Sequence, residues 1–128
     1  MAQIPEEDVW YPNEEFVLTV HELMLKEYGG HPGFIRGIEV FEHILKEMKP
    51  IKGIYCKAAI LLRNLVTVRI FQNGHHRTGL EVTKTFLEMN DKKMKIQDTE
   101  KIIKFIKDIA LINRVNILQA SRAHFNSF

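Results

Sequence analysis

The apolar positions of this chain return every three or four residues along most of its length. Over residues 14–28 this spacing predicts an amphipathic helix with one face toward a core. Asn13 is a favourable N-cap for this helix, and Gly29 with Gly30 would end it. Residues 1–12 lack the pattern, so we expect a loose N-terminal lead-in there. The residues expected to face the core are Phe16, Val17, Val20, Leu23 and Met24.

Three more segments carry a helical pattern before residue 90. One helix is expected over residues 38–48, with Phe41, Ile44 and Leu45 inward. Residues 52–70 are apolar around most of the helix circumference, which is typical of a buried central helix. Another helix is expected over residues 76–89. Its inward residues would be Leu80, Val82, Thr83, Phe86 and Leu87.

The last part of the chain predicts two further helices. One is capped by Asp98 or Thr99, and the other covers about residues 113–125. No alternation of apolar and polar residues extends far enough to predict a β-strand. We therefore expect an all-α bundle of about six helices, in which residues 13–128 form a single domain.

Composition narrows the class of protein. The 128 residues are 45% hydrophobic and 27% charged, which suits one globular core. The net charge of +2 comes from basic residues scattered among acidic ones, without the basic stripe of a nucleic-acid surface. The apolar run at residues 58–62 stops at Arg63, far short of the roughly 20 residues that a membrane span requires. We expect a cytoplasmic protein that binds neither nucleic acid nor membrane.

Most of the residues that could bind a ligand or take part in a reaction lie in the segment 71–79. Gly74 would let the backbone approach a ligand, and a side chain there would crowd both the bend and a bound phosphate. The first N–H groups of the following helix, together with the helix dipole, attract anions. Arg77 offers a planar, charged fork for phosphate, and an ion pair with a nearby acid is the alternative. The pattern predicts an anion-binding turn.

Two histidines extend this turn. His75 and His76 could donate to a phosphate or act as a base, since an unperturbed imidazole titrates near pH 6.5; roles in structure or in solvent are the alternatives. Adjacent side chains at a helix start diverge by about 100°, and no other histidine has the spacing of a zinc site, so we expect no metal-ligand set. His21 lies among apolar positions of the first helix and is expected to be a hydrogen-bonded histidine at the edge of the core.

Residues 69–77 also fit a longer motif. They read Arg69-Ile70-Phe71-Gln72-Asn73-Gly74-His75-His76-Arg77, beside a pattern His-x-Phe-x-Asp/Glu-Gly-Asn-Gly/Lys-Arg, so that Phe71, Gly74 and Arg77 match. That pattern is the signature of the Fic/Doc (death-on-curing-like) family, which this chain resembles over about residues 14–90. Other similar features are His21-Glu22, the turn with Gly29, Gly30 and Gly33, and the start of a central helix at Lys57-Ala58-Ala59.

The resemblance implies a helical fold and a nucleotide-dependent transferase. Members move AMP (AMPylation) or a phosphoryl group from a nucleoside triphosphate to a protein hydroxyl. It therefore implies ATP or another nucleoside triphosphate as substrate, and a protein target as partner. Doc-like members are often paired with a small inhibitor protein in toxin–antitoxin systems, so such an inhibitor is another partner that the resemblance implies.

The reactive positions of the family motif are substituted. Arg69 replaces the general-base histidine and cannot accept a proton near neutral pH, although it could hold phosphate oxygens or be a surface arginine. Asn73 replaces the acid that holds Mg²⁺; an amide is a poor ligand for this cation, and Asn also favours turns. His75 replaces the phosphate-facing Asn, and His76 replaces the Gly or Lys before Arg77.

These substitutions leave two function classes open. The first is a transferase of the Fic/Doc kind with altered or lost catalysis, for which the catalytic candidates are Arg69, His75 and His76. The second is a non-catalytic protein that binds a nucleotide, a phosphate or a partner in a toxin–antitoxin-like system. Whether the protein is an enzyme stays open between them. The candidate phosphate- or nucleotide-binding residues are Asn73, Gly74, His75, His76 and Arg77.

Overall fold

The computed structural model describes residues 4–93 of the chain. Its elements are the 3-10 helices η1 (Glu6–Asp8) and η2 (Ile38–Val40) and the α-helices α1 (Glu14–Tyr28), α2 (Phe41–Met48), α3 (Ile54–Thr67) and α4 (His75–Met89). The described residues contain no strand, and Phe34 and Phe71 form an isolated antiparallel bridge. The predicted all-α class is confirmed. The two helices predicted after residue 98 lie outside the described residues.

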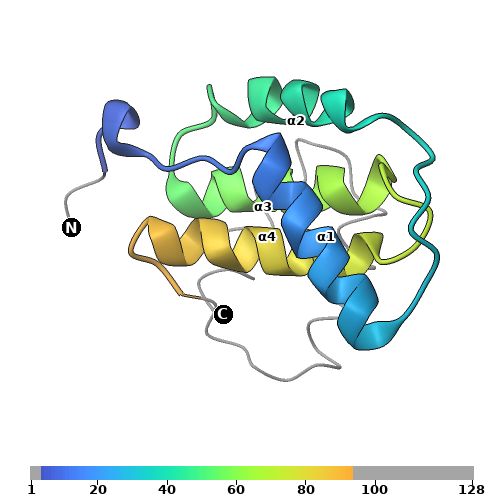
Figure 1. Cartoon of the computed structure of the whole chain (residues 1–128). Helices are drawn as coiled ribbons and strands as arrows, with labels where there is room; N and C mark the ends of the chain where they lie inside the picture. The colour runs from blue at the N-terminus through green and yellow to red at the C-terminus, as the bar shows by residue number, and fades with distance from the viewer. Residues whose placement is uncertain (1–3, 94–128) are drawn as a thin grey trace.

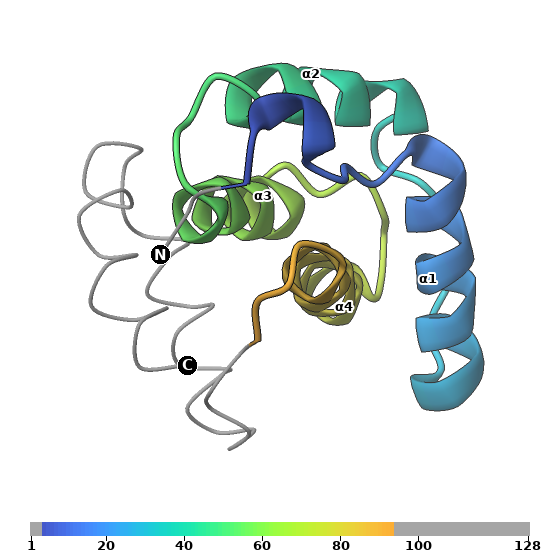
Figure 2. The same cartoon turned by 90° about the vertical axis from the view of Figure 1, so that its left-hand side faces the viewer.

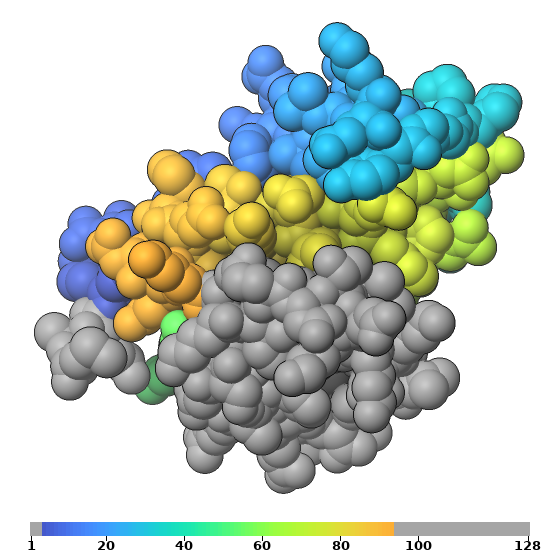
Figure 3. All heavy atoms as spheres, turned by 90° about the horizontal axis from the view of Figure 1, so that it is seen from below, coloured from blue at the N-terminus to red at the C-terminus, as the bar shows by residue number. Residues whose placement is uncertain are grey.

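The helices α3 and α4 form the centre of the described fold. They pack along each other in opposite directions, because the connection at residues 68–74 reverses the chain between them (Figure 1). The helix α2 lies over α3, and α1 crosses α4 on another side (Figure 2). The view from below shows α1 lying directly against α4 (Figure 3). None of the described helices is long and apolar enough to cross a membrane.

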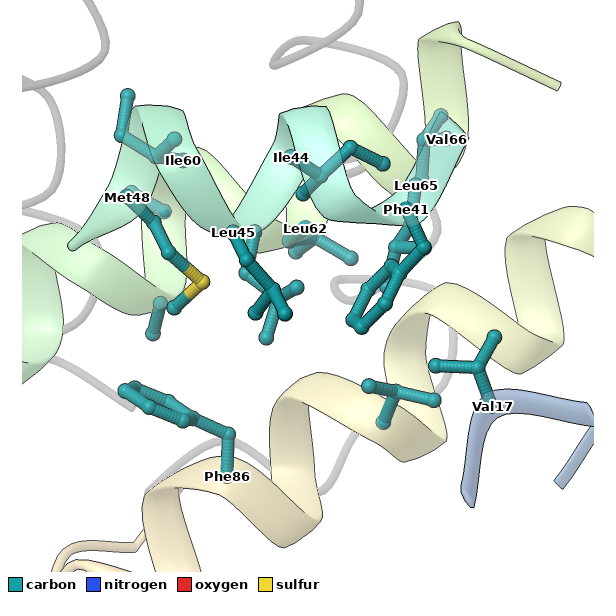
Figure 4. Packing of buried hydrophobic residues seen from close by; sticks show 14 of the residues in the cluster. Val17, Phe41, Ile44, Leu45, Met48, Ile60, Leu62, Leu65, Val66 and Phe86 are labelled. Atoms are coloured by element: carbon teal, nitrogen blue, oxygen red, sulfur yellow. The ribbon is translucent and has the colours of Figure 1, made fainter. Parts of the chain in front are cut away.

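The core forms where side chains of the four α-helices meet (Figure 4). The helix α2 is amphipathic, and it buries one stripe at the predicted spacing: Phe41, Ile44, Leu45 and Met48. In α3 five consecutive residues, 58–62, are at most 1% exposed, which confirms the predicted central helix. In α4 the predicted burial is confirmed for Val82, Thr83, Phe86 and Leu87, while Leu80 is only half-buried.

The first helix buries a narrower face than its sequence pattern predicts. Val17 and Val20 are buried, but Leu23 is 55% exposed, so its predicted place in the core is wrong. The helix crosses α4 instead of lying in a groove between two helices, and only a narrow stripe of it is covered. Its N-terminus is as predicted, because Asn13 Oδ1 accepts a hydrogen bond from Phe16 N at 2.8 Å.

The lead-in is attached to the bundle within residues 4–12. Trp10 N donates to Asn90 Oδ1 at 2.9 Å, and Asn90 Nδ2 donates back to Trp10 O at 3.0 Å. The same amide nitrogen reaches Phe86 O at 2.8 Å. Asn90 is 2% exposed, so it is a buried clamp between the end of α4 and the lead-in. The expectation of a loose lead-in is wrong for this stretch, because a side chain 80 residues away holds its backbone.

Candidate functional site

The turn at residues 69–74 lies against the loop at residues 29–36. At this end of the molecule the loop after α1 passes beside the turn between α3 and α4 (Figure 1). Ile35 N donates to Ile70 O at 2.9 Å, and Gln72 N donates to Gly33 O at 2.9 Å. The two segments that carry the Fic/Doc resemblance, about 40 residues apart in sequence, are therefore joined through their backbones.

Two glycines of the loop face this close approach, and they differ in how much it depends on them. A Cβ atom added to Gly30 would lie 2.9 Å from Leu25 Cδ2 and 3.1 Å from Asn73 Cβ. One added to Gly33 would lie 2.5 Å from Gln72 Oε1. At Gly30, whose φ is 125°, the added Cβ atom would crowd Asn73, so a larger residue there would strain the contact between loop and turn. At Gly33 the close atom is the end of the exposed Gln72 side chain, which can turn aside. Gly30 is therefore the glycine that serves the contact between the two segments.

His21 fixes the turn from the side of α1. Its ring is buried and stacks on Phe71, with centroids 3.6 Å apart and planes 10° from parallel. Its Nε2 atom lies 2.8 Å from Asn73 O. A carbonyl oxygen only accepts, so Nε2 carries a proton and donates it to Asn73 O. The predicted hydrogen-bonded position at the edge of the core is confirmed, and His21 orients the carbonyl just before Gly74.

Asn73 uses both ends of its amide to hold the turn. Its Oδ1 atom accepts from His31 N at 2.7 Å, and its Nδ2 atom donates to Gln72 O at 2.9 Å. Within residues 4–93 no three histidine, cysteine, aspartate or glutamate side chains gather in a way that could hold a metal ion. The residues present do not fit the Mg²⁺ site of the Fic/Doc pattern, because its acidic ligand is replaced by an amide already engaged in the turn.

Gly74 is the N-cap of α4 and has left-handed backbone, with φ 77° and ψ 8°. A Cβ atom there would come no nearer than 3.5 Å to the side chains of His21 and Leu25, which is an ordinary contact. The predicted crowding of the bend is therefore wrong, and the backbone conformation is what favours glycine. The helix begins at His75, one residue earlier than predicted, and its first backbone hydrogen bond runs from Thr78 N to Gly74 O at 2.9 Å.

His75 is half-buried in the first turn of α4. Its Nδ1 atom is buried without a hydrogen-bond partner, and its ring meets that of His76 edge to face at 4.3 Å. Burial, and after it the charges of His76 and Arg69, lower the pKa of His75 to about 4. The imidazole is therefore neutral at pH 7. No carboxylate contributes to this shift, so the surroundings of the ring are cationic.

Arg77 contacts an aromatic ring that the sequence did not point to. Its guanidinium carbon lies 3.7 Å from the ring centroid of Tyr28, at the end of α1. Among residues 4–93 the structure shows no ion pair for Arg77, so the predicted alternative, a nearby acid, is not its partner here. Stacking covers one face of the guanidinium, whereas its N–H groups lie in the plane and stay available to an anion. The signal that the sequence offered for this contact was Tyr28 itself, an aromatic residue at the end of a helix directly before Gly29.

Arg69 follows the end of α3 with an exposed side chain and a positive φ of 51°. Its Nη2 atom makes only a long contact of 3.5 Å to Gln72 O, yet its charge is felt at His75. The structure thus brings the predicted residues Arg69, His75 and His76 together at one end of α4. Arg77 lies in the same helical turn but faces Tyr28.

The arrangement is suited to holding an anion. It combines the N-terminus of a 15-residue helix with two arginines and a neutral imidazole that lacks a partner on Nδ1. No known protein-family model matches the chain, and no characterised protein matches its sequence. The Fic/Doc resemblance therefore depends on the motif residues, and membership of that family stays a prediction.

Proposed function

We propose that the protein binds a phosphate group of a nucleotide at residues 69–77 without transferring it by the ordinary Fic/Doc mechanism. One observation carries this proposal. The first turn of α4 contains two of the three buried side-chain atoms that lack a partner within residues 4–93, His75 Nδ1 and Thr78 Oγ1, and the charges of His76 and Arg69 act on the first of them. Buried polar atoms are rarely left unsatisfied, so a polar ligand at this turn would explain them.

The helix end supplies the main attraction. Backbone N–H groups before Thr78 have no acceptor inside α4, and the dipole places partial positive charge there. Gly74 has no side chain to shield this end. Arg77, held by Tyr28, would approach an anion with its fork already restrained, which lowers the entropy lost on binding.

The turn lacks the chemical groups that transfer by the ordinary Fic/Doc mechanism requires. The guanidinium of Arg69 offers only N–H donors and no acceptor for the proton of a hydroxyl. His75, with a pKa of about 4, is a weak base near neutral pH. The amide of Asn73 is committed to the turn on both sides. Binding without turnover therefore fits the groups present better than a complete transferase site does.

One observation favours altered catalysis as a second candidate. The pKa of His75 is lowered partly by positive charges, and a bound phosphate would offset them. The imidazole of the complex would then be a better base, positioned beside the phosphate. Incubation with labelled ATP and a cell extract tests this candidate. Labelling of a protein by the wild type that is lost with His75→Asn supports transfer. If the wild type labels no protein, the function is restricted to binding.

The primary test is calorimetric titration with ATP, GTP, CTP and UTP, with and without Mg²⁺. Arg77→Ala is expected to weaken binding at least tenfold, about 1.4 kcal/mol, because it removes a charged fork. Lys46→Ala is the matched control, since it removes an exposed positive charge from α2. Arg77→Lys, which keeps the charge without the fork, should lie between wild type and Arg77→Ala.

Three results would overturn the proposal. They are no binding of any nucleotide at millimolar concentration, equal affinity of Arg77→Ala and wild type, and equal weakening by Lys46→Ala. Competition with inorganic phosphate locates the recognised group, because displacement of the nucleotide by phosphate is expected if the turn holds the phosphate end. A strong increase in affinity with Mg²⁺ would contradict the role given to Asn73.

A further inference from the structure

A second site lies at the opposite end of α3 from the turn. There a pocket of about 700 Å³ opens between the lead-in, the segment joining α2 to α3, the first turn of α3 and Lys92. In Figure 2 the lead-in passes close to the segment between α2 and α3. This volume is in the range of small-molecule sites. Part of its lining is aliphatic, with Ile4, Val9, Ile51 and Ile54.

The charged lining of the pocket is predominantly positive. Four lysines and one glutamate line it, which leaves an excess of three positive charges: Lys49, Lys52, Lys57 and Lys92 against Glu6. The helix α3 also starts here, after Gly53, with no acidic residue in its first turn and no side-chain cap. The partial positive charge of the helix end is therefore not offset by its own first turn.

One lysine is already satisfied by the protein. Lys57 is 2% exposed, and its Nζ atom lies 3.2 Å from Glu6 Oε2 and 2.6 Å from Lys49 O. Tyr11 donates a short hydrogen bond to the same glutamate. Glu6 carries the one carboxylate among the described lining residues, and this carboxylate is committed to Lys57 and Tyr11. This cluster is a structural part of the pocket wall, and it leaves the other three lysines to supply the excess positive charge.

The other lysines form no ion pair within residues 4–93, although the charge of Lys49 helps to lower the pKa of Glu6. Lys49 Nζ lies 5.4 Å from the ring centroid of Tyr11, and Lys92 Nζ lies 6.0 Å from that of Tyr55. The structure shows no ion pair for Lys52 among the described residues. An ammonium group near an aromatic face keeps donors that an anion can use. Positive charge next to aliphatic walls is complementary to a ligand with one charged and one apolar end.

We propose that this pocket binds a small amphiphilic anion, with a hydrocarbon body and a phosphate or carboxylate head. The body lies along the aliphatic lining, and Lys52 with Lys92 holds the head at the rim. This ligand is independent of the nucleotide proposed for the turn, since the two sites lie at opposite ends of α3.

The test is calorimetric titration of the full chain with decyl phosphate below its micelle concentration. Decanol and inorganic phosphate, which each carry one half of the proposed ligand, are the controls. Decyl phosphate should bind at least tenfold more tightly than either of them, and decanoate tested in parallel identifies the preferred head. Equal affinity for decanol, equal affinity for inorganic phosphate when the turn is weakened by Arg77→Ala, or no saturable binding of decyl phosphate or decanoate would overturn the proposal.

Paired variants assign the binding to this pocket. The double variant Lys52→Ala with Lys92→Ala is expected to weaken decyl phosphate binding at least tenfold. Lys26→Ala with Lys46→Ala changes the net charge equally on α1 and α2, outside the pocket, and should bind like wild type. Circular dichroism checks the fold of both. Equal affinity of the two double variants, or a comparable loss with Arg77→Ala, would show that the ligand binds elsewhere.

Discussion

The two ends of the α3–α4 pair treat buried polar groups differently. At the lead-in end, Asn90 and Lys57 are each 2% exposed, and every polar atom of their side chains has a partner. At the turn end, His75 Nδ1 and Thr78 Oγ1 are buried without one. Both ends carry positive charge. The difference is that the buried side chains of Asn90 and Lys57 are satisfied within the chain, whereas two buried atoms at the turn are not. The third such atom within residues 4–93, Thr83 Oγ1, lies midway along α4.

This difference separates stability from binding. A fully satisfied buried amide stabilises the fold, and removing it leaves its partners without hydrogen bonds. An unsatisfied buried atom costs free energy in the free protein, and a ligand that satisfies it recovers that cost on binding. Substitutions of the satisfied buried groups at the lead-in end should therefore act mainly on unfolding, and the unsatisfied atoms at the turn should respond mainly to ligands. The following predictions compare the two ends.

The largest effect on stability is expected for Asn90→Ala. It would leave the N–H and C=O groups of Trp10 without their partner, at a cost of about 3 kcal/mol in the free energy of unfolding. Urea unfolding followed by circular dichroism measures this. Glu88→Ala, an exposed neighbour on the same helix, should change the value by less than about 0.5 kcal/mol. Similar changes in the free energy of unfolding for the two variants would show that Asn90 does not act as a clamp.

A smaller loss is expected for Gly74→Ala, because the residue has φ 77°. Left-handed backbone costs a residue with a Cβ atom about 1 to 2 kcal/mol. Space is not the cause, since the nearest atoms to an added Cβ are 3.5 Å away. Gly74→Asn should therefore lose less, as asparagine tolerates this conformation. If alanine and asparagine destabilise equally in urea unfolding, the backbone explanation fails.

Arg69 has the same kind of backbone conformation without being glycine, at φ 51°. Glycine relieves this strain and alanine does not, so Arg69→Gly should be more stable than Arg69→Ala by about 1 kcal/mol. Comparing the two variants cancels the loss of the arginine side chain itself. Thermal unfolding of both proteins measures the difference, and a higher midpoint for the alanine variant would contradict strain at this position.

The smallest effect on stability at neutral pH is expected for substitution of His75. The influence of this residue on the free energy of unfolding appears only at acidic pH. Its pKa is about 4 in the folded chain and near 6.5 when unfolded. Between these values the unfolded chain binds more protons, so stability falls as the pH drops from 6.5 to 4. The thermal midpoint of wild type should fall more from pH 7 to pH 4.5 than that of His75→Asn.

Two controls connect this pH effect to the turn. His43→Asn changes an exposed histidine of α2 and should retain the wild-type pH response. Added phosphate should reduce the loss of wild-type stability in acid, because an anion offsets the charges that lower the pKa of His75. If His75→Asn responds to pH like wild type, the pKa of His75 is not lowered by its burial and by the neighbouring charges as described.

Local patterns in the sequence determined the secondary structure of the described residues. The N-cap at Asn13, the buried stripe of α2 and the all-round burial of α3 follow from residue type and spacing within a few turns of helix. The same holds for a turn at Gly74 with a helix after it. Each of these features depends on neighbours along the chain, and the sequence contains that information directly.

Only the tertiary structure decided which side chains of different elements contact each other. It left Leu23 exposed, buried Asn90 against Trp10, placed Arg77 on Tyr28 and lowered the pKa of His75. These outcomes depend on how α1 crosses α4 and where the lead-in passes, which involve residues some 50 to 80 positions apart. Helical periodicity tells which face of a helix is apolar, but it does not tell which surface will cover that face. That is why the sequence alone indicated the anion turn, while the pocket and the satisfied lead-in end emerged only from packing.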